Sequence, residues 1–480
     1  MKYFISDLHI GDKSPWDCFG NKKAELLIKL LERIDRHMNH AGELILLGDI
    51  FDFTLLADDP RSPKKIDSAK IFARVRKAYP HLFVAFREFI RAGNGLFYVW
   101  GNHDYPMRFK KHAHQFQKAV LRRWWDSFGQ RHIWFSDYYI SPTHGLYAEH
   151  GHRYDVTNVH VNGGYMTLGS LMASRFVKKW QTWESKRQTE GNGIEDGSHP
   201  FQILGNIRPW PNIIYYIDRL IDQGVFSERE KKELTRDLYN IQEEAKSSVP
   251  HIFFRILQSM PWFIQEGVVS SRLKDEAPRS LREKAKLLLK GYSTDLSVAS
   301  KRATVGSKKD LNFVPKMIVF GHTHFMEHAL LEEGKYLYAN TGSWQDTIFV
   351  NRQGRIMKIQ DICPYLEVYP PEKDEVPVAI HRRALDGKEI DLKELFKDYE
   401  KFGLTLNSHF KAELIGNFEI VQMLVFNRWG QLVYEGTSLD GWDGQHDGKP
   451  APPDVYVYSI KLRLPNGNVI LKKGDVTLVR

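Results

Sequence analysis

The sequence predicts an α/β domain that is interrupted by a long helical insertion and followed by a small all-β module. Short apolar runs alternate with helical spacing in the first 150 residues, which is typical of a layered α/β core. Over residues 156–315 the pattern becomes aromatic-rich and mostly helical, and strand-like runs return from residue 316. From residue 396 onward, short alternating runs separated by turn clusters are typical of an all-β sandwich.

The α/β domain is built from strands and helices that alternate along the chain. Its expected elements are a strand at 3–6, a helix over 22–39, a strand at 43–47, a helix over 67–91, a strand at 96–100 and, after the insertion, strands at 316–320 and 336–339. The first three strands each end in a polar loop, and α/β sheets bind their ligands at such strand ends. We therefore expect one discontinuous core, made of residues 1–155 and 316–365, with residues 156–315 inserted as a cap.

The C-terminal part is expected to form a separate all-β module over residues 396–480. Alternating apolar and polar residues predict strands at 422–426, 432–434, 455–464 and 469–478, with Asp-Gly and Asn-Gly pairs at the turns. The stretch 364–378 is rich in proline and charge, so residues 366–395 are expected to form a linker between core and module.

Composition narrows the class of protein. Apolar residues make up 42% and charged residues 26% of the 480-residue chain, which are ordinary values for a globular protein. No apolar run approaches the roughly 18–20 residues of a membrane-spanning helix, which argues against an integral membrane protein. The two cysteines, Cys18 and Cys363, are too few for a disulfide scaffold or a cysteine-rich metal site.

An excess of basic residues predicts an anionic partner. The 68 Lys and Arg residues exceed the 59 Asp and Glu residues, which gives a net charge of +9, and basic residues are dense over 74–123 and 272–310. An anionic membrane surface or lipid or a nucleic-acid backbone would fit these segments, and a solvated basic face fits them equally well. The sequence shows no aromatic platform for single-stranded nucleic acid, so it gives no firm nucleic-acid signal.

The first residues give an expectation about location. Residues 1–7 predict a short buried strand and lack the basic, apolar and small-residue regions of a signal peptide. A cytoplasmic location is therefore expected, with peripheral contact to a membrane as an option. Secretion or display at the cell surface is expected only if a signal peptide precedes Met1.

Five polar clusters carry the chemistry, and each lies just after a predicted strand. They are Asp7-Leu8-His9, Gly48-Asp49-Ile50-Phe51-Asp52, Gly101-Asn102-His103-Asp104, His150-Gly151-His152 and Gly321-His322-Thr323-His324. Their carboxylates, imidazoles and carboxamide form a mixed nitrogen and oxygen set that suits Zn, Mn, Fe or Mg. A single cluster of this kind would usually be a capped turn, but five at the strand ends of one α/β domain predict a metal centre.

In this order the clusters resemble the motifs DxH, GDxxD, GNHD, a histidine block and GHxH of the calcineurin-like metallophosphoesterase superfamily. The resemblance covers residues 1–152 and 316–362, and residues 340–343 (Asn-Thr-Gly-Ser) are similar to the segment that closes the family's core. It implies a four-layer α/β/β/α sandwich with a binuclear centre, and hence two divalent metal ions as cofactors.

The resemblance also implies a role for each candidate residue. One metal would be held by Asp7, His9, Asp49 and His324, and Asp49 would bridge to a second metal held by Asn102, His150 and His322. His103, paired with Asp104, would neutralise the phosphoryl oxygens or protonate the leaving group. In the fourth cluster either His150 or His152 is the ligand, and His150 is preferred because it directly follows a predicted strand. Asp52 and His152 are then expected to support the ligands or to contact substrate.

The implied activity is hydrolysis of a phosphate ester. Two metals clamp the attacking and leaving oxygens, and a metal-bridging hydroxide attacks phosphorus in line, so no Cys or Ser nucleophile is needed. The sequence does not choose between monoesters and diesters, because His103 serves both. A binding or scaffold protein with a vestigial site is a further alternative, against which the complete ligand set argues.

The insertion lies between the fourth and fifth clusters, so it is expected to cover the metal site. It resembles the lid of the lipid A precursor hydrolases of this superfamily, which cleave a UDP-linked diacylated sugar pyrophosphate, although those enzymes carry Arg where this chain has His103. Hydrolysis of a lipid-linked pyrophosphate is therefore an alternative function. The insertion's aromatic residues either line an apolar groove or form its own core; they are Trp180, Trp183, Trp210, Phe253, Phe254, Trp262 and Phe263.

The C-terminal module has a distinctive sequence at residues 425–434 (VFNRWGQLVY) and 441–444 (GWDG). Over residues 405–480 it resembles the gliding-motility-type C-terminal domain, which acts in Bacteroidota as a type B sorting signal for type IX secretion. The resemblance implies docking to the secretion machinery. Docking of another partner at an exposed edge strand is the alternative.

Overall fold

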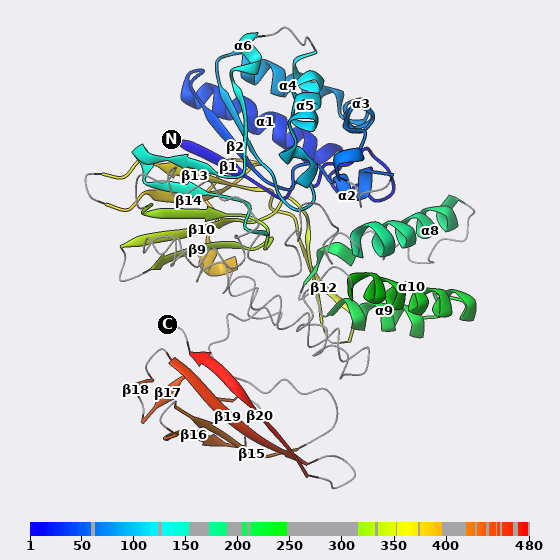
Figure 1. Ribbon diagram of the computed structural model, residues 1–480, viewed down its shortest axis with the longest axis vertical. Helices are drawn as coiled ribbons and strands as arrows, with labels where there is room; N and C mark the ends of the chain where they lie inside the picture. The colour runs from blue at the N-terminus through cyan, green and yellow to red at the C-terminus, as the bar shows by residue number, and fades with distance from the viewer. Residues whose placement is uncertain are drawn as a thin grey trace. The chain divides into compact units, whose positions relative to one another are not determined.

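The structure is a computed structural model in which the chain folds into two compact units, Met1–Lys397 and Asp398–Arg480 (Figure 1). The residues that it describes are 1–58, 63–122, 127–152, 172–189, 204–208, 212–246, 315–331, 335–351, 353–372, 375–395, 419–427, 430–437, 441–447, 449–451, 454–463 and 469–478. The first unit holds the α/β core and the insertion, and the second holds the C-terminal module.

The first unit is built around a six-stranded sheet in the order β14-β13-β1-β2-β3-β4. Its strands are β1 (Lys2–Ile5), β2 (Glu43–Leu47), β3 (Gly95–Val99), β4 (Ile133–Ser136), β13 (Pro364–Tyr369) and β14 (Val378–Arg383). Strands β1 to β4 are parallel, β13 pairs antiparallel with β1, and β14 pairs antiparallel with β13. The helices that follow are α1 (Gly20–Met38), the short α2 (Phe53–Leu56), α3 (Ser68–Ala78), α4 (Pro80–Arg91) and α5 (Lys110–Leu121), of which the long ones cover the outer face of this sheet (Figure 1).

A second, five-stranded sheet packs against the first. Its order is β5-β6-β8-β10-β9, with β5 (Tyr139–Ser141), β6 (Leu146–Ala148), β8 (Met317–Phe320), β9 (Met326–Leu331) and β10 (Tyr336–Thr341). Strands β6 and β8 are parallel neighbours although the whole insertion separates them in sequence. The segments on the two sides of the insertion therefore belong to one sheet.

The apolar side chains of the first sheet alternate between its two faces, as the period of a strand requires. Tyr3 and Ile5 pack with the helices, whereas Phe4 joins Ile45 and Val319 in the cluster between the two sheets. The described elements thus form helices, sheet and sheet in succession, which confirms the mixed α/β prediction. Residues on the far face of the second sheet are buried as well, and the fourth, helical layer stays a prediction.

The linker predicted over residues 366–395 is wrong, because most of β13 and all of β14 lie there as strands of the six-stranded sheet. Leu366 is fully buried between the two sheets. The charges that favoured a linker are paired with each other: Glu367, which is 3% exposed, lies 2.5 Å from Arg382 Nε on β14. The proline pair at 370–371 follows β13, where a missing amide donor costs no hydrogen bond of the sheet.

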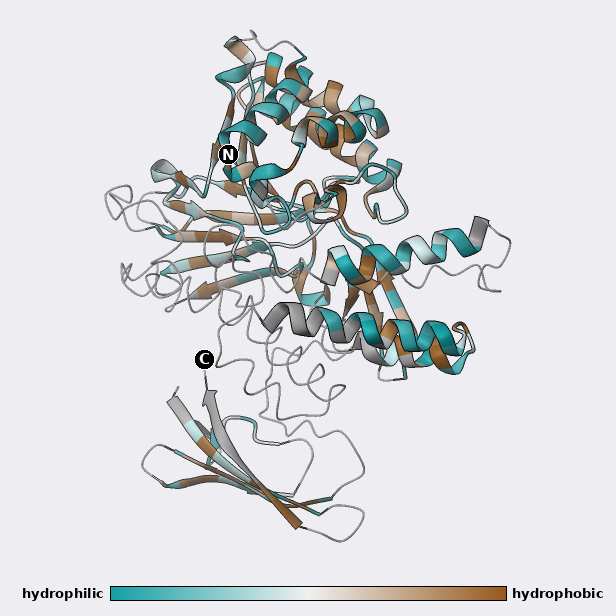
Figure 2. Ribbon diagram, turned by 45° about the vertical axis from the view of Figure 1, so that its right-hand side comes forward, coloured by the Kyte–Doolittle hydropathy of each residue, from teal (hydrophilic) through white to brown (hydrophobic). Residues whose placement is uncertain are grey.

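The described part of the insertion is mostly helical. It contains the π-helical turn η6 (Met172–Val177) and the helices α8 (Lys178–Thr189), α9 (Asn212–Asp222) and α10 (Glu228–Lys246), whose exposed sides are largely hydrophilic (Figure 2). Its short strand β7 (Ile207–Arg208) pairs with β11 (Thr347–Val350), which in turn pairs with β12 (Ile356–Gln360). No helix in the described parts of the chain is both long and apolar enough to cross a membrane.

Three aromatic residues distinguish between the two alternatives for the insertion. The rings of Trp180, Trp183 and Phe226 pack together at centroid distances of 5.5–5.9 Å. The indole N–H of Trp180 donates to Asp237, and that of Trp183 donates to Glu230. These aromatic residues form the insertion's own core. The other residues proposed for a groove lie outside the described residues; they are Trp210, Phe253, Phe254, Trp262 and Phe263.

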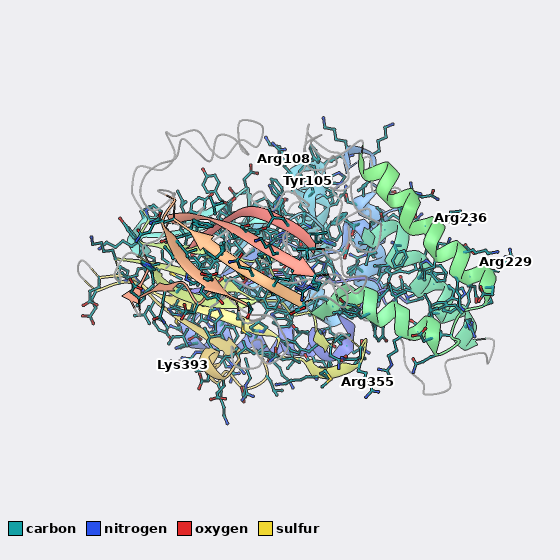
Figure 3. All side chains as sticks on the ribbon, turned by 90° about the horizontal axis from the view of Figure 1, so that it is seen from below. Tyr105, Arg108, Arg229, Arg236, Arg355 and Lys393 are labelled. Atoms are coloured by element: carbon teal, nitrogen blue, oxygen red, sulfur yellow. The ribbon has the colours of Figure 1, made fainter. Side chains whose placement is uncertain are left out.

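Basic residues of α10 project to the outside. Arg229 and Arg236 lie along the outer side of this helix (Figure 3), and the side chain of Arg236 is 67% exposed although it lies 4.0 Å from Glu233. These arginines lie outside the two basic segments singled out in the sequence, so an anionic partner for those segments stays a prediction. The basic segment 272–310 lies outside the described residues.

The second unit is a four-stranded antiparallel sheet with a two-stranded ribbon. The sheet has the order β16-β15-β19-β20, and the elements are β15 (Glu419–Phe426), β16 (Leu432–Gly436), β17 (Gln445–His446), β18 (Lys449–Pro450), β19 (Asp454–Arg463) and β20 (Val469–Leu478). Trp442 of the GWDG sequence is 1% exposed and packs on Tyr456, with ring centroids 4.7 Å apart. The all-β character of the module is confirmed, and its closure into a sandwich stays a prediction.

Candidate metal centre

The candidate site lies where the loops after β1, β2, β3, β6 and β8 meet, and these loops carry all five polar clusters. Backbone hydrogen bonds align the first two loops: Asp7 N donates to Gly48 O at 3.0 Å, and His9 N donates to Asp49 O at 2.9 Å. The fifth cluster joins them through His322 N, which donates to Asp7 Oδ2 at 3.0 Å. Parallel strands thus bring distant parts of the sequence to one edge.

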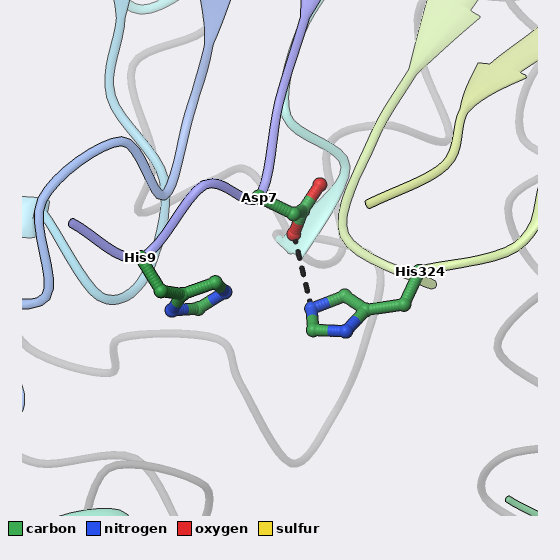
Figure 4. Close-up of side chains that lie close together, drawn as sticks. All are labelled: Asp7, His9 and His324. Carbon is green, nitrogen blue, oxygen red and sulfur yellow. Dashed lines mark ion pairs between the residues drawn. The ribbon is translucent and has the colours of Figure 1, made fainter. Parts of the chain in front are cut away.

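Asp7, His9 and His324 form the first group of converging side chains (Figure 4). One ligand atom from each lies within 4.8 Å of the others, and Nε2 of His324 is 3.3 Å from Asp7 Oδ1. The carboxylate of Asp7 is fully buried, whereas the two imidazoles are slightly exposed. This group offers one oxygen and two nitrogen ligands, a set that suits Zn, Mn or Fe.

Asp49, His150 and His322 form the second group. Nε2 of His150 is 3.1 Å from Asp49 Oδ2 and 4.0 Å from Asp7 Oδ1, so the two groups are adjacent. Nδ1 of His150 donates to the carbonyl oxygen of Leu47 at 2.8 Å. This hydrogen bond fixes the ring so that Nε2 is the nitrogen that faces the carboxylates.

The geometry favours His150 over His152 as the ligand of the fourth cluster. His150 converges with Asp49 and His322, whereas His152 belongs to none of the groups found among the described residues. His152 is 3% exposed, and its ring centroid lies 5.4 Å from that of His150 and 5.1 Å from that of Trp100. His152 therefore borders the centre without converging on it.

A third group, made of His9, Asp49 and His103, overlaps both of the others. The backbone amide of His103 donates to Asp49 Oδ1 at 2.8 Å, which draws this loop to the centre. Asp52 Oδ2 lies 3.0 Å from Nδ1 of His103 and 3.2 Å from Nδ1 of His9. One carboxylate therefore orients two imidazoles, as carboxylates beside metal-binding histidines do.

The predicted pairing of His103 with Asp104 is wrong, because the carboxylate of Asp104 binds elsewhere. Asp104 Oδ2 accepts a hydrogen bond from the Tyr98 hydroxyl at 2.6 Å and another from the Ile50 amide at 2.8 Å. Asp104 is fully buried and fixes the loops after β2 and β3. The partner of His103 is instead Asp52.

Asn102, the predicted carboxamide ligand, is 3% exposed and follows Gly101 in the loop after β3. Gly101 is required at its position, because a Cβ atom there would overlap Asp49 Oδ1. The loop thus passes directly beside Asp49, with Asn102 as the next residue. Its role as a ligand stays a prediction.

The backbone is strained at the candidate ligands. Eleven non-glycine residues of the described chain have a positive φ angle, and five of them are candidate ligands: Asp7 (53°), His9 (50°), Asp49 (54°), His322 (71°) and His324 (63°). Such a conformation costs roughly 1–3 kcal/mol per residue and gathers at functional sites. Sequence motifs give the spacing of these residues but not their backbone conformation, so the sequence carried no signal for the strain.

The buried carboxylates and imidazoles set each other's pKa values. Burial favours the neutral form of Asp7, but His150 and His324 outweigh burial and lower the pKa of Asp7 to about 2. Burial also favours neutral His150, but Asp49 and Asp7 raise the pKa of His150 to about 10. In the same way, His150 and His103 hold the pKa of Asp49 well below its ordinary value in spite of burial. The carboxylates thus gather positive charge around themselves, as expected of a cation site.

One atom of the centre fits a metal ion directly. Nε2 of His9 is buried and makes no hydrogen bond to any described residue. A buried polar atom without a partner is costly and calls for an explanation. A divalent cation bound between Asp7, His9 and His324 would satisfy this nitrogen, and the donor set of the group fits such a cation.

Residues outside the five polar clusters support the centre. The hydroxyl of Ser6 hydrogen-bonds Thr341 Oγ1 at 2.6 Å and Gly342 O at 3.1 Å. Ser343 Oγ donates to the carbonyl oxygen of Asp7 at 3.1 Å. The segment 340–343 was recognisable from its sequence, whereas Ser6 carried no signal that could have identified it.

Comparison with protein families assigns both parts of the chain. The model of the calcineurin-like phosphoesterase family matches residues 3–227, and the model of the CHU_C type IX secretion signal domain matches residues 403–478. The chain therefore contains a calcineurin-like phosphoesterase domain, whose family supports a hydrolase acting on phosphate esters. It also contains a type IX secretion signal domain, so the resemblances to these two families are confirmed. The resemblance of the insertion to the lid of the lipid A precursor hydrolases stays a prediction. No curated protein matches the chain.

The secretion signal domain changes the expectation about location. A type IX secretion signal over residues 403–478 favours export rather than the cytoplasmic location expected from the first residues. The cytoplasmic location was expected from residues 1–7 alone, which include β1 of the core and carry no information about a C-terminal sorting signal.

Proposed function

We propose that the chain hydrolyses phosphate esters with two divalent metal ions held by its five loops. The observation that carries the proposal is the pair of adjacent groups, each with one carboxylate and two imidazoles: Asp7, His9 and His324 beside Asp49, His150 and His322. Each group would hold one metal. Asp49 Oδ2 lies 4.0 Å from His9 Nε2 and 3.1 Å from His150 Nε2, a position that suits a ligand shared by both metals. Asn102 would add an oxygen ligand to the second site.

Two metals in such a site supply charge neutralisation and an activated water for in-line attack on phosphorus. The chain's own contribution to the transition state is His103. Burial alone would lower the pKa of His103, but the carboxylates of Asp52 and Asp49 raise it to about 9. A protonated His103 donates a hydrogen bond to a phosphoryl oxygen or a proton to the leaving group. Asp52 keeps the ring in place through Nδ1.

The test is hydrolysis of p-nitrophenyl phosphate and bis-p-nitrophenyl phosphate by the metal-stripped full chain, with Mn, Zn, Mg or Fe added back. We expect turnover only with metal, and a loss of at least about 100-fold in Asp49→Ala. Asp386→Ala is the matched control, because this carboxylate pairs with Arg383 at the surface, and it should keep full turnover. Turnover without metal, or in Asp49→Ala, would contradict the proposal. Absence of both metal binding and turnover would favour a scaffold protein.

A lipid-linked pyrophosphate is the alternative substrate. The packing of Trp180, Trp183 and Phe226 into the insertion's own core removes one argument for a lipid groove. Relative turnover of a monoester, a diester and a nucleotide-diphospho-lipid distinguishes the substrate classes. Preference for the simple esters supports the leading proposal, and preference for the lipid-linked substrate supports the alternative.

We also propose that the protein is exported and acts outside the cytoplasm. The match to a type IX secretion signal domain over residues 403–478 supports this, and the secretion machinery would be the partner of the second unit. In a host with type IX secretion, the full chain should reach the cell surface or medium, and a chain ending at residue 397 should stay inside. Equal distribution of the two chains would contradict the proposal.

A further inference from the structure

The last carbonyl groups of the short helix α2 are bound by cations from two other elements. Lys178 Nζ donates to Leu55 O at 2.6 Å and lies 3.4 Å from Ala57 O. Arg74 Nη2 donates to Leu56 O at 2.6 Å. Terminal carbonyls of a helix lack intrahelical donors, and a nearby cation stabilises them. Lys178 is the first residue of α8 in the insertion, whereas Arg74 belongs to α3 of the core, so the end of α2 joins the insertion to the core.

The other end of α2 is Asp52, the residue that orients the metal centre. Asp52 caps the helix, because its Oδ1 accepts a hydrogen bond from Leu55 N at 3.1 Å, while its Oδ2 faces His9 and His103. The backbone oxygen of Asp52 also accepts from Leu56 N at 2.9 Å. A single helical turn has little stability of its own. Asp52 and the bound carbonyl groups thus lie at the two ends of a single helical turn.

The ammonium group of Lys178 is held at this position from several sides. Besides the two carbonyl groups, it lies 4.9 Å from the centre of the Trp16 ring, where a cation–π interaction adds to the binding. Burial lowers the pKa of Lys178, with Asp58 opposing the shift. The next residue, Lys179, serves another purpose: its ammonium lies 2.6 Å from Glu233 and 2.7 Å from Asp237, both on α10 of the insertion.

We propose that Lys178 is a positioning residue that couples the docking of the insertion to the orientation of His9 and His103, acting through α2 and Asp52. This inference rests on the proposed hydrolase function. Lys178 binds the carbonyl end of α2, and its charge also acts on Asp52 through space. Without its ammonium group, α2 loses two hydrogen bonds to the insertion, and Asp52 no longer holds both imidazoles in one arrangement.

Hydrogen exchange in the full chain tests the coupling without relying on turnover. Lys178→Met keeps the length of the side chain and removes its charge. We expect exchange of the amides at 53–57 to become about 10-fold faster, which is the effect of losing a hydrogen bond to a charged group. Lys179→Met is the matched control and should leave these amides unchanged. Lys178→Arg should restore most of the protection. Equal exchange at 53–57 in Lys178→Met and Lys179→Met would overturn the proposal.

Kinetics then test the route through Asp52. With p-nitrophenyl phosphate, Lys178→Met should lower kcat about 10-fold and change KM less than about threefold. In an Asp52→Asn background the same substitution should lower kcat less than about twofold, because the route is already interrupted. Effects that multiply in the double variant would overturn the proposal. If the wild-type chain shows no turnover, this result counts against the hydrolase function but not against the coupling of Lys178 to Asp52. Hydrogen exchange at residues 53–57 then tests that coupling by itself.

Discussion

Two regions of the first unit that contain buried histidines, the candidate metal centre and the hairpin of β13 and β14, shift the pKa of their histidines in opposite directions. At the metal centre, Asp49 and Asp7 outweigh burial and raise the pKa of His150 to about 10. In the hairpin of β13 and β14, His381 is 2% exposed and donates from Nε2 to the Asn340 carbonyl oxygen at 2.7 Å, and burial lowers its pKa to about 4. The comparison separates a histidine surrounded by carboxylates from one that packs as a neutral member of a core.

The buried carboxylates of the two regions show the same contrast. In the hairpin, Glu367 lies 2.5 Å from Arg382 Nε and accepts a hydrogen bond from the Tyr369 hydroxyl at 2.9 Å. At the metal centre, Asp7 and Asp49 have histidines but no Lys or Arg as ion-pair partners in the part of the chain that the structure describes. The hairpin pairs its carboxylate with a guanidinium that keeps its proton, whereas the carboxylates of the centre face imidazoles, which are able to bind a metal ion once they lose their protons.

The largest expected effect comes from replacing one histidine in each region. His150→Gln removes a candidate ligand and should lower metal-dependent kcat/KM at least about 100-fold. His381→Gln should leave turnover unchanged, because a glutamine amide can still donate to Asn340. His152→Gln should lower kcat/KM less than about 10-fold, since His152 only borders the centre. If His152→Gln were as damaging as His150→Gln, the assignment of the fourth cluster would be wrong.

Substitutions of Asp52 and Asp104 should affect different quantities, the first mainly kcat and the second mainly the free energy of unfolding. Asp52→Asn weakens the hold on His103 and should lower kcat roughly 10- to 100-fold. Asp104→Asn leaves a single carbonyl oxygen for the donors of Tyr98, Ile50 and Gly101 and sets its amide N–H against at least one of them, so it should lower the free energy of unfolding by about 1–3 kcal/mol. Steady-state kinetics and urea unfolding of both variants measure the two effects. A larger loss of kcat in Asp104→Asn than in Asp52→Asn would contradict the observed pairing.

The ion pair of the hairpin should matter for stability alone. Arg382→Met leaves Glu367 buried without its cation, and we expect the free energy of unfolding to fall by about 2 kcal/mol with kcat unchanged. Arg383→Met is the matched control, because Arg383 pairs with Asp386 at the surface, and such a pair contributes about 0–1 kcal/mol. Equal destabilisation by the two substitutions would show that Glu367 does not depend on Arg382.

His381 should make the fold sensitive to acid. Its folded-state pKa of about 4 lies below the ordinary value of 6.5, so the unfolded chain binds the proton first as the pH falls. The contribution of His381 to the free energy of unfolding is complete above pH 6.5. It is lost as the pH falls from 6.5 to 4, by at most about 1.4 kcal/mol per pH unit. Urea unfolding at pH 7 and pH 5 should therefore show a smaller loss of stability for His381→Gln than for wild type. Identical losses would rule out His381 as the cause.

Much of the fold followed from the sequence because strands and ligand clusters leave local patterns. Period-two alternation located β15, β16, β19 and β20, and each polar cluster follows a strand. The hairpin of β13 and β14 escaped prediction because its charges are satisfied by each other, and the pairing of Glu367 with Arg382 exists only in the folded chain. The proline and charged residues of this segment therefore predicted a linker, although the buried strand β13 lies there.

The sequence predicted which residues form the candidate site, but not which of them contact each other. His103 and Asp104 are adjacent in sequence, yet the carboxylate of Asp104 binds Tyr98 and Ile50, and the partner of His103 is Asp52 from another loop. Positive φ angles at ligands such as Asp7 are likewise set by the packing of loops against each other. Sequence spacing identifies which residues meet at the strand ends, but the contacts between loops decide how they meet.

Anomalous diffraction from crystals of the full chain grown with Mn²⁺ tests the binuclear centre most directly. The account predicts two Mn²⁺ ions roughly 3.5–4 Å apart, one bound by Asp7, His9 and His324 and the other by His150 and His322, with Asp49 as a ligand of both. Crystals of Asp49→Ala should lose at least one of the two ions. Mn²⁺ at other residues only, or no Mn²⁺ at these loops, would contradict the account.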